Sequence, residues 1–207
     1  MEEPAKFWDW MAKRYSRQPI ADEAAYQEKL SRTRHHFTPE CQVLEIGCGT
    51  GSTAIAHAPY VGHIHATDIS ANMLSIAREK ASAEGLANIS FEQVSLCGLE
   101  GKAASWDVIL GLSVLHLLPD MDRDIALAHM LLKPGGVFIT SSPCIADMST
   151  ALRFVAPLFK WLPFLPSVIV FSRAELEASL EKVGFTIESI WRPDNNKALF
   201  IVARKPE

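Results

Sequence analysis

The stretch Val43-Leu44-Glu45-Ile46-Gly47-Cys48-Gly49-Thr50-Gly51 decides the fold class of this chain. Its first half is an apolar run typical of a buried strand, and glycines then alternate until Ser52 and Thr53 open a helix. Glycines at such a turn let the backbone bend tightly and let a ligand approach where a Cβ would stand in the way. A dinucleotide-binding loop reads G-x-G-x-x-G, but here the third glycine, Gly51, comes one position early. The stretch therefore predicts a ligand-binding strand, loop and helix of a different kind.

The acidic residue just before these glycines indicates the charge of the ligand. Glu45 precedes Gly47 by two positions. A carboxylate beside a pyrophosphate would be repelled, because both groups are negative. The same carboxylate beside a cationic ligand would be attracted to it. The sequence favours a ligand with positive charge.

Outside this stretch, short apolar runs alternate with helical patterns. The strands expected in this part of the chain are 41–46, 62–67, 88–94, 106–111 and 136–141, and the helices are 21–37, 52–57, 72–84 and 122–131. Strands that alternate with helices run parallel in one sheet, with helices on both of its faces. In such sheets a ligand lies beyond the carboxyl ends of the strands, at the point where the strand order reverses.

The last part of the chain departs from this alternation. A helix is expected at 173–183, followed by strands at 185–191 and 198–203. The connection 192–197 is too short for a crossover helix, so the last two strands should be antiparallel. The predicted fold is therefore α/β and Rossmann-like: a doubly wound, mostly parallel seven-stranded sheet with one antiparallel strand near its edge and helices on both faces.

The composition limits the classes of function. The 207 residues are 48% hydrophobic, and no repeat or linker divides them, so we expect a single domain over 1–207. The net charge is -4 without a clustered basic face, which argues against nucleic acid as a partner. The four cysteines form no C-x-x-C pair, so neither a metal site nor a disulfide framework is expected.

Location and membrane contact follow from the ends and from one apolar segment. The N-terminal stretch MEEPAKFWDW lacks the basic start and apolar run of a secretory signal. Together with isolated thiols, this favours the cytoplasm. The segment 154–171 is apolar, but Pro157, Pro163 and Pro166 interrupt it, so no transmembrane segment is expected.

The glycine stretch resembles motif I, E/D-x-G-x-G-x-G, of the class I S-adenosylmethionine-dependent methyltransferases. The similarity continues with Asp68 at the end of the second strand and with Trp106-Asp107-Val108-Ile109 in the fourth. Leu131-Leu132-Lys133-Pro134-Gly135-Gly136 resembles the family's turn into the fifth strand. These motifs appear in the family's order over almost the whole chain. The resemblance implies a methyltransferase with S-adenosyl-L-methionine as cofactor and no metal.

The resemblance also implies which residues hold the cofactor. Asp68 matches the acid that the family uses for the ribose hydroxyls, and Glu45 supplies negative potential near the methionine end. Many family members place Asp after the third strand to bind the adenine amino group, whereas this chain has Ser95 there. The candidate cofactor-binding residues are Tyr15, Glu45, Gly47, Cys48, Gly49, Gly51, Asp68, Ile69, Met73, Ser95, Leu96, Gly111 and Leu112.

Three elements are candidates for the site of the methyl acceptor. Residues 1–37 form an N-terminal helical cover, whose aromatic start either folds over the cofactor or packs as a helix on the sheet. His116, after the fourth strand, is either a catalytic base or a core histidine held by backbone groups. The insertion 142–171 is an apolar lid that lines the acceptor pocket, packs as core, or touches a membrane surface or a partner. The candidate substrate-binding residues are Trp10, His116, Phe154, Phe159 and Trp161.

These observations predict transfer of a methyl group to an O, S or N atom of a small, largely apolar molecule by in-line displacement. Two alternatives stay open. One is methylation of a macromolecule or of a lipid or quinone, and the other is a non-catalytic subunit that binds S-adenosylmethionine. The identity of the acceptor and the oligomeric state are left open by the sequence.

Overall fold

The computed structural model describes residues 3–148, 168–194 and 197–207. The strands are β1 (Gln42–Ile46), β2 (His63–Asp68), β3 (Ile89–Gln93), β4 (Trp106–Leu112), β5 (Leu132–Ser142), β6 (Thr186–Trp191) and β7 (Leu199–Arg204). The α-helices are α1 (Glu3–Tyr15), α2 (Glu23–Arg34), α3 (Ser52–His57), α4 (Ala71–Ala83), α5 (Met121–Leu131), α6 (Ile145–Met148) and α8 (Arg173–Lys182). Short 3₁₀ helices are η1 (Ala58–Tyr60), η2 (Leu96–Lys102) and η3 (Leu115–Leu117).

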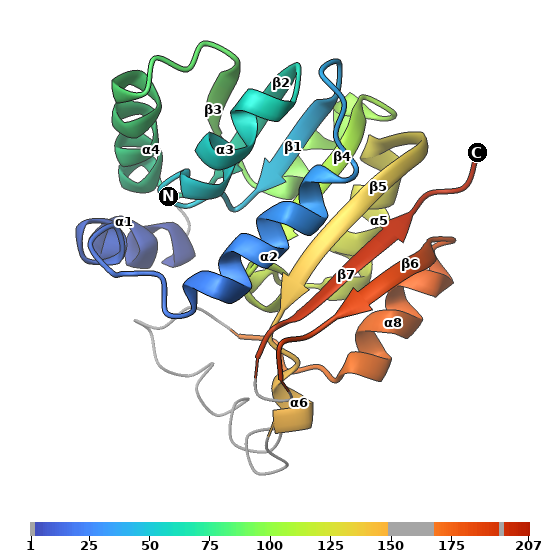
Figure 1. Cartoon of the computed structure of the whole chain (residues 1–207). Coiled ribbons are helices and arrows are strands. Elements are labelled where there is room, and N and C mark those ends of the chain that lie inside the picture. Colours follow the sequence, from blue (N-terminus) through green and yellow to red (C-terminus); the bar gives the residue numbers. More distant parts are fainter. Residues whose placement is uncertain (1–2, 149–167, 195–196) are drawn as a thin grey trace.

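The strands form one sheet in the order β3-β2-β1-β4-β5-β7-β6. All neighbouring pairs are parallel except those of β7, which runs antiparallel to both β5 and β6 (Figure 1). The predicted fold class, including one reversed strand near the edge, is confirmed. The strand order reverses between β1 and β4, so the carboxyl ends of these two strands mark where a ligand is expected.

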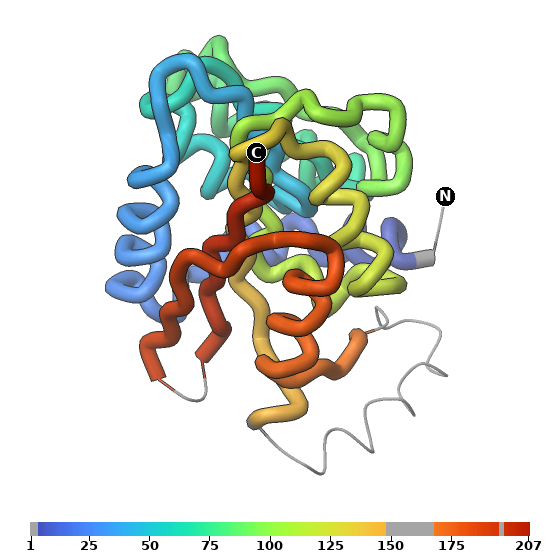
Figure 2. The backbone as a smooth tube through the Cα atoms, turned by 90° about the vertical axis from the view of Figure 1, so that its right-hand side faces the viewer, coloured from blue at the N-terminus to red at the C-terminus, as the bar shows by residue number. Residues whose placement is uncertain are grey.

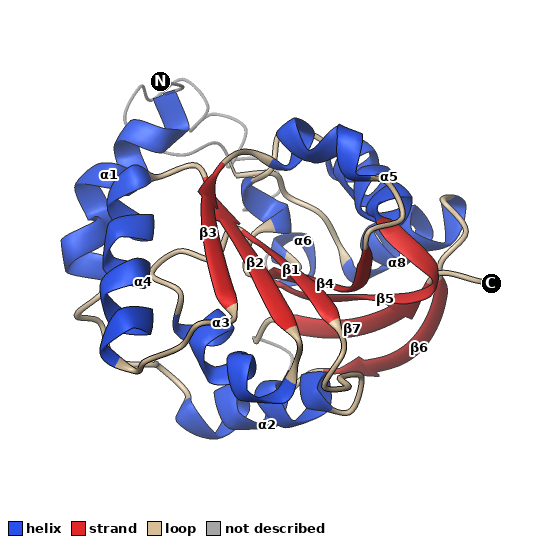
Figure 3. Ribbon diagram, turned by 90° about the horizontal axis from the view of Figure 1, so that it is seen from above, coloured by secondary structure: helices blue, strands red, loops and turns tan. Residues whose placement is uncertain are grey.

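Helices cover both faces of the sheet (Figure 3). On one face, α2, α3 and α4 pack over a core cluster that includes Val43, Ile64 and Phe200. On the other face, α5 and α8 pack over a cluster that includes Leu44 and Phe138. Val43 and Leu44 fall in opposite clusters because successive side chains of a strand point to opposite faces. Figure 2 views the edge farthest from α4, where α8 and the β6–β7 hairpin face the viewer.

Two local predictions differ from the structure. β5 begins at Leu132, so the predicted turn before the fifth strand already belongs to the strand. The cause is a bulge, because Trp106 pairs with Leu132 and the register then shifts before Val108 pairs with Val137. The stretch after β3, for which no helix was predicted, forms the 3₁₀ helix η2.

The N-terminal aromatic segment is a helix, α1, which packs against α4. Ala5 and Ala12 on α1 are buried, with 4% and 0% of their surface exposed. Small side chains two turns apart on one face let the two helices approach closely. Within the described ranges no helix has the length and apolarity needed to cross a membrane.

Candidate functional site

A cleft of about 150 Å³ opens at the carboxyl ends of β1, β2 and β4 and is covered by α1. This is the point at which the strand order reverses. Its lining residues are Pro4, Trp8, Tyr15, Ile46, Gly47, Gly49, Asp68, Ile69, Met73, Val94, Ser95, Leu96, Leu112, Ser113, Val114, Leu117 and Leu118. The lining is apolar apart from a few polar groups, and it contains no lysine or arginine.

The loop after β1 brings bare backbone to the floor of the cleft. Gly49 has φ +55°, and a Cβ built on it would lie 3.9 Å from Cε1 of Tyr15 with no closer contact. The space beside Gly49 is therefore open to a ligand, and a side chain there would occupy it. Gly51 differs, because a Cβ on it would lie only 2.8 Å from Cβ of Ala77 in α4. Gly51 thus allows α3 and α4 to pack and does not line the cleft.

Asp68 ends β2 and holds the glycine loop in place. Its Oδ2 accepts a hydrogen bond from the backbone N–H of Gly49 at 2.8 Å, and its Oδ1 accepts one from Ser70 N–H at 2.9 Å. Burial raises the pKa of Asp68, while these backbone N–H groups act to lower it. Both carboxylate oxygens are fixed by the backbone, and each keeps a further lone pair for a ligand hydroxyl.

Glu45 is a second buried acid close to the cleft. Its side chain lies on the face of β1 that carries α2, its exposure is 3%, and its Oε2 has no hydrogen-bond partner. Burial and the charge of Asp68 raise the pKa of Glu45 to about 8. Within the described ranges, neither acid forms an ion pair. Two buried acids without a cation favour a positively charged ligand.

This arrangement predicts that a cationic ligand will release a proton when it binds near pH 7. Glu45 is mostly protonated in the free protein because its pKa is about 8. A nearby positive charge favours the carboxylate and lowers that pKa, so affinity should rise with pH up to about 8. Calorimetry in buffers of different ionisation enthalpy should show release of a fraction of one proton per ligand.

The matched control for this prediction is Glu45→Gln, which keeps the shape of the side chain and cannot ionise. Its binding should show no proton release between pH 6 and 8. A wild-type protein that binds a cationic ligand with no proton exchange would contradict the account of Glu45.

Most of the residues predicted to bind the cofactor line the cleft, and the others lie outside its lining. The predicted residues that line the cleft are Tyr15, Gly47, Gly49, Asp68, Ile69, Met73, Ser95, Leu96 and Leu112. The predicted residues outside the lining are Glu45, Cys48, Gly51 and Gly111. Cys48 belongs to the core cluster under α3, and burial raises the pKa of its thiol. A Cβ on Gly111 would lie 3.1 Å from the ring of Phe138, so this glycine serves packing of the sheet.

The predicted acceptor residues are placed less favourably. Trp10 lies on the outer face of α1 with 74% of its surface exposed, and Trp8 takes the position in the cleft. Phe154, Phe159 and Trp161 lie outside the described residues. The cleft wall after β3 and β4 also includes Val94, Val114, Leu117 and Leu118, which were not predicted from the sequence. Apolar residues at strand ends carry no sequence signal that separates a cleft wall from core.

His116 lies in η3, between residues that line the cleft, but it is not itself part of the lining. Its Nδ1 is buried without a hydrogen-bond partner, and burial lowers the pKa of the ring to about 4. Its backbone oxygen accepts a hydrogen bond from Ile169 N–H at 2.8 Å. The ring is therefore neutral at pH 7, with one nitrogen available to accept a proton.

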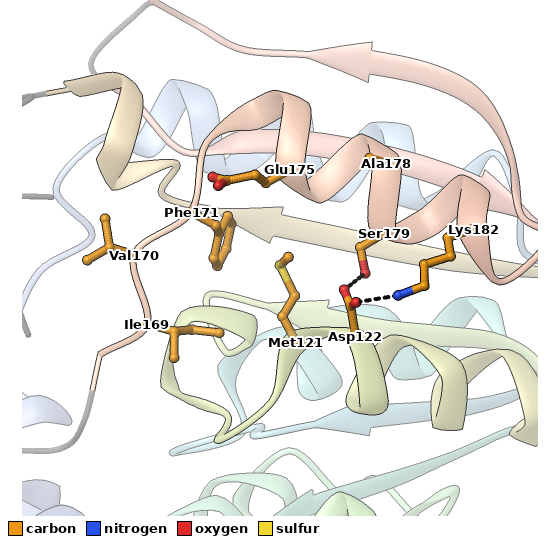
Figure 4. A pocket seen from close by; sticks show the side chains of 9 residues that line it. All are labelled: Met121, Asp122, Ile169, Val170, Phe171, Glu175, Ala178, Ser179 and Lys182. Carbon is orange, nitrogen blue, oxygen red and sulfur yellow. Dashed lines mark hydrogen bonds and ion pairs between the residues drawn. The ribbon is translucent and has the colours of Figure 1, made fainter.

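A second, larger groove of about 390 Å³ lies between α5 and α8 (Figure 4). Two of its charged groups, Asp122 and Lys182, already pair, because Asp122 accepts hydrogen bonds from Lys182 Nζ at 2.8 Å and Ser179 Oγ at 2.6 Å. It lies away from the ends of β1 and β2 and has no buried acid without a partner. The groove has the larger volume, but the chemistry of the lining residues favours the cleft as the ligand site.

Comparison with known families identifies the domain. The protein-family model described as "Methyltransferase domain" matches residues 43–136 of this chain. These residues run from β1 into β5 and include the glycine loop and Asp68. The chain carries a class I S-adenosylmethionine-dependent methyltransferase domain. The methyltransferase domain has similar sequences among curated proteins and similar folds among solved structures.

Two relatives and one structure illustrate the similarity. The arsenite methyltransferase of Aquipseudomonas alcaligenes is 37% identical over 106 residues, covering 46% of this chain and 31% of that protein. The demethylmenaquinone methyltransferase of Geobacillus kaustophilus is 30% identical over 128 residues, covering 57% of this chain and 55% of that protein. The crystal structure of YcgJ from Bacillus subtilis superposes with a TM-score of 0.72 at 19% identity, covering 87% and 99% of the two chains. The chain thus spans about a third to a half of the length of these two curated relatives.

The residues of the cleft fit S-adenosylmethionine, the cofactor of this class of methyltransferase domain. Its sulfonium and ammonium groups are positive, and the cleft floor lies beside two buried acids. The open space at Gly49 accommodates a ligand, and Ile69 and Leu96 offer apolar walls to a base ring. No group of three metal-binding side chains occurs in the part of the chain that the structure describes.

Proposed function

We propose that this protein transfers a methyl group from S-adenosylmethionine to an O, S or N atom of a small, largely apolar molecule. The single observation that carries the donor half of this proposal is the pair of buried acids, Glu45 and Asp68, beside the open backbone of Gly49. The fold alone would not carry it, because one fold supports many chemistries.

When bound, S-adenosylmethionine supplies a methyl group activated by a positively charged sulfur. The chain's own residues then have three tasks. Asp68 accepts hydrogen bonds from the ribose hydroxyls, and the negative potential of Glu45 favours the cationic end. Trp8 and Tyr15 on α1 cover the cleft and exclude water. Holding two reactants in line can supply roughly 7 kcal/mol or more of the barrier reduction, so positioning is the main contribution expected.

The acceptor class is inferred from the wall of the cleft after β4. Leu112, Val114, Leu117 and Leu118 are apolar, and the lining holds no basic side chain for a phosphate or polyanion. Two relatives have names that specify arsenite and demethylmenaquinone as acceptors, one inorganic and one a quinone. For this chain a weakly charged, largely apolar acceptor fits the wall better than a nucleic acid, which would need basic side chains for its phosphates.

The test is a methyl-transfer assay with donor labelled in the methyl group. Wild-type protein is incubated with a panel of thiols, phenols, quinols, amines and carboxylic acids, and with bulk protein and RNA. We expect labelled product from a neutral apolar compound and none from the macromolecules. Transfer confined to macromolecules or to phosphorylated compounds would contradict the acceptor class. Donor binding without any transfer would favour the non-catalytic alternative.

His116 is the proposed catalytic base for a hydroxyl acceptor. Because burial lowers its pKa to about 4, the ring stays in its base form above that pH. Turnover should therefore be flat between pH 5.5 and 8 and fall only near pH 4. His116→Gln should lower kcat about 10²–10⁴-fold if the ring takes the proton.

Two results bear on this assignment. If kcat of His116→Gln falls by less than about tenfold, His116 has no proton-transfer role. That result is expected for a thiol acceptor, which is already partly thiolate. An acid limb near pH 6.5 that disappears in His116→Gln would contradict the lowered pKa.

A further inference from the structure

Asp9 fixes α1 to the start of α4. Its Oδ1 accepts a hydrogen bond from Ser70 Oγ at 2.6 Å and another from the backbone N–H of Asn72 at 3.0 Å. The side-chain amide of Asn72 donates in turn to the backbone oxygen of Asp9 at 3.1 Å. Three hydrogen bonds therefore join residues that lie more than sixty positions apart in the chain.

These contacts continue into the candidate cofactor site. Ser70 is fully buried and is the N-cap of α4, where its Oγ accepts from Met73 N–H at 3.1 Å. The backbone N–H of Ser70 donates to Asp68, whose other oxygen accepts from Gly49 N–H. A continuous chain of hydrogen bonds thus runs from α1 through the start of α4 and the end of β2 to the glycine loop.

The charge of Asp9 suits its position at the first turn of α4. The first N–H groups of a helix have no partner within the helix, and the helix dipole favours a negative charge there. Hydrogen bonds to an ionised acceptor are also stronger than neutral ones. The carboxylate of Asp9 therefore makes stronger hydrogen bonds with Ser70 and Asn72 than an amide at this position would make.

The helix that Asp9 joins to α4 also carries two residues of the cleft. Trp8 and Tyr15 are on the same helix and line the cleft, with Tyr15 closest to Gly49. The cleft holds about 150 Å³, less than the roughly 300–1,000 Å³ typical of ligand pockets. Because Trp8 and Tyr15 of α1 line this small cleft, the position of α1 controls how readily a ligand of the size of S-adenosylmethionine enters and leaves it.

We propose that Asp9 is a positioning residue that holds α1 over the cofactor cleft and couples the position of α1 to Asp68. The contacts of Asp9 with Ser70 and Asn72 are the latch. The identity of the ligand rests on the proposed function, whereas the latch itself is a property of the free protein. Opening the latch should speed both entry and release of the ligand and should loosen α1 without unfolding the sheet.

The first test needs no ligand. Hydrogen exchange of the free protein is compared for wild type, Asp9→Ala and Lys13→Ala, a matched change at an exposed position of the same helix. Asp9→Ala should speed exchange of the α1 amides roughly 10-fold or more, with the sheet amides unchanged. Lys13→Ala should match wild type. Unchanged α1 exchange in Asp9→Ala would overturn the latch.

The second test measures release of S-adenosylhomocysteine by stopped flow. Asp9→Ala should raise the dissociation rate roughly 10-fold, and Asp9→Asn, which keeps the acceptor oxygen but not the charge, should lie between it and wild type. Equal release rates in wild type and Asp9→Ala would overturn the proposal. If wild type binds no S-adenosylhomocysteine, the proposed function fails, and the hydrogen-exchange result still decides the latch.

Discussion

Replacing Gly49 with alanine is expected to reduce affinity for S-adenosylmethionine by about 10- to 100-fold while the protein stays folded. The new Cβ meets no protein atom closer than 3.9 Å, so in the proposed site it fills space that the ligand would occupy. Intrusion of one methyl group into a packed site costs about 1–3 kcal/mol, or roughly 5- to 150-fold in affinity, and the expected loss lies within this range. Gly49→Val should weaken binding further, because its branched side chain reaches deeper into the cleft.

The control for this prediction is Gly85→Ala. Gly85 also has a positive φ, +67°, and a Cβ there has open space, but it lies after α4 and away from the cleft. Both variants place a Cβ in the left-handed region, which costs roughly 1–2 kcal/mol per residue, so thermal melting should show similar losses of stability. Only Gly49→Ala should lose affinity in calorimetry. Equal affinities in the two variants would remove Gly49 from the site.

Asp68→Ala is expected to weaken binding by about 1.5–3 kcal/mol, or roughly 10- to 150-fold, the scale of hydrogen bonds to a charged group. The loss has two sources. In the proposed binding mode the ribose hydroxyls lose their acceptor. The backbone N–H groups of Gly49 and Ser70 also lose the carboxylate that now fixes them. Calorimetry with S-adenosylmethionine measures the change.

Asp68→Asn separates these two sources. Its amide keeps one oxygen for a backbone N–H, so the loop should loosen less than in Asp68→Ala, while the charge on the ribose side is lost. We expect an affinity between wild type and Asp68→Ala. A folded Asp68→Ala protein with wild-type affinity would show that the cofactor lies elsewhere.

The sheet could be predicted from sequence because its information is local. Each strand is a short apolar run, each helix has a polar–apolar period, and the connection 192–197 is too short to cross the sheet. The start of β5 could not be predicted, because it depends on Trp106 pairing with Leu132 across a bulge. α1 posed the same difficulty, since its position depends on contacts with α4.

The site was predictable where a motif fixes the backbone and less so where packing decides. Asp68 and Gly49 follow from spacing, and both line the cleft. Trp8 and Trp10 lie on opposite sides of one helix, and which of them faces inward depends on how α1 packs on α4, where Asp9 contacts Ser70. That contact spans 61 positions, and no local pattern announces it.

A crystal structure of the protein with S-adenosylhomocysteine tests the central claim most directly. We predict the ribose hydroxyls within about 3 Å of the Asp68 carboxylate, the hydrogen-bonding range for such groups. The base should lie between Ile69 and Leu96, and the amino-acid end beside Gly49. Ligand bound in the groove between α5 and α8, or in the cleft without contact to Asp68, would contradict the account.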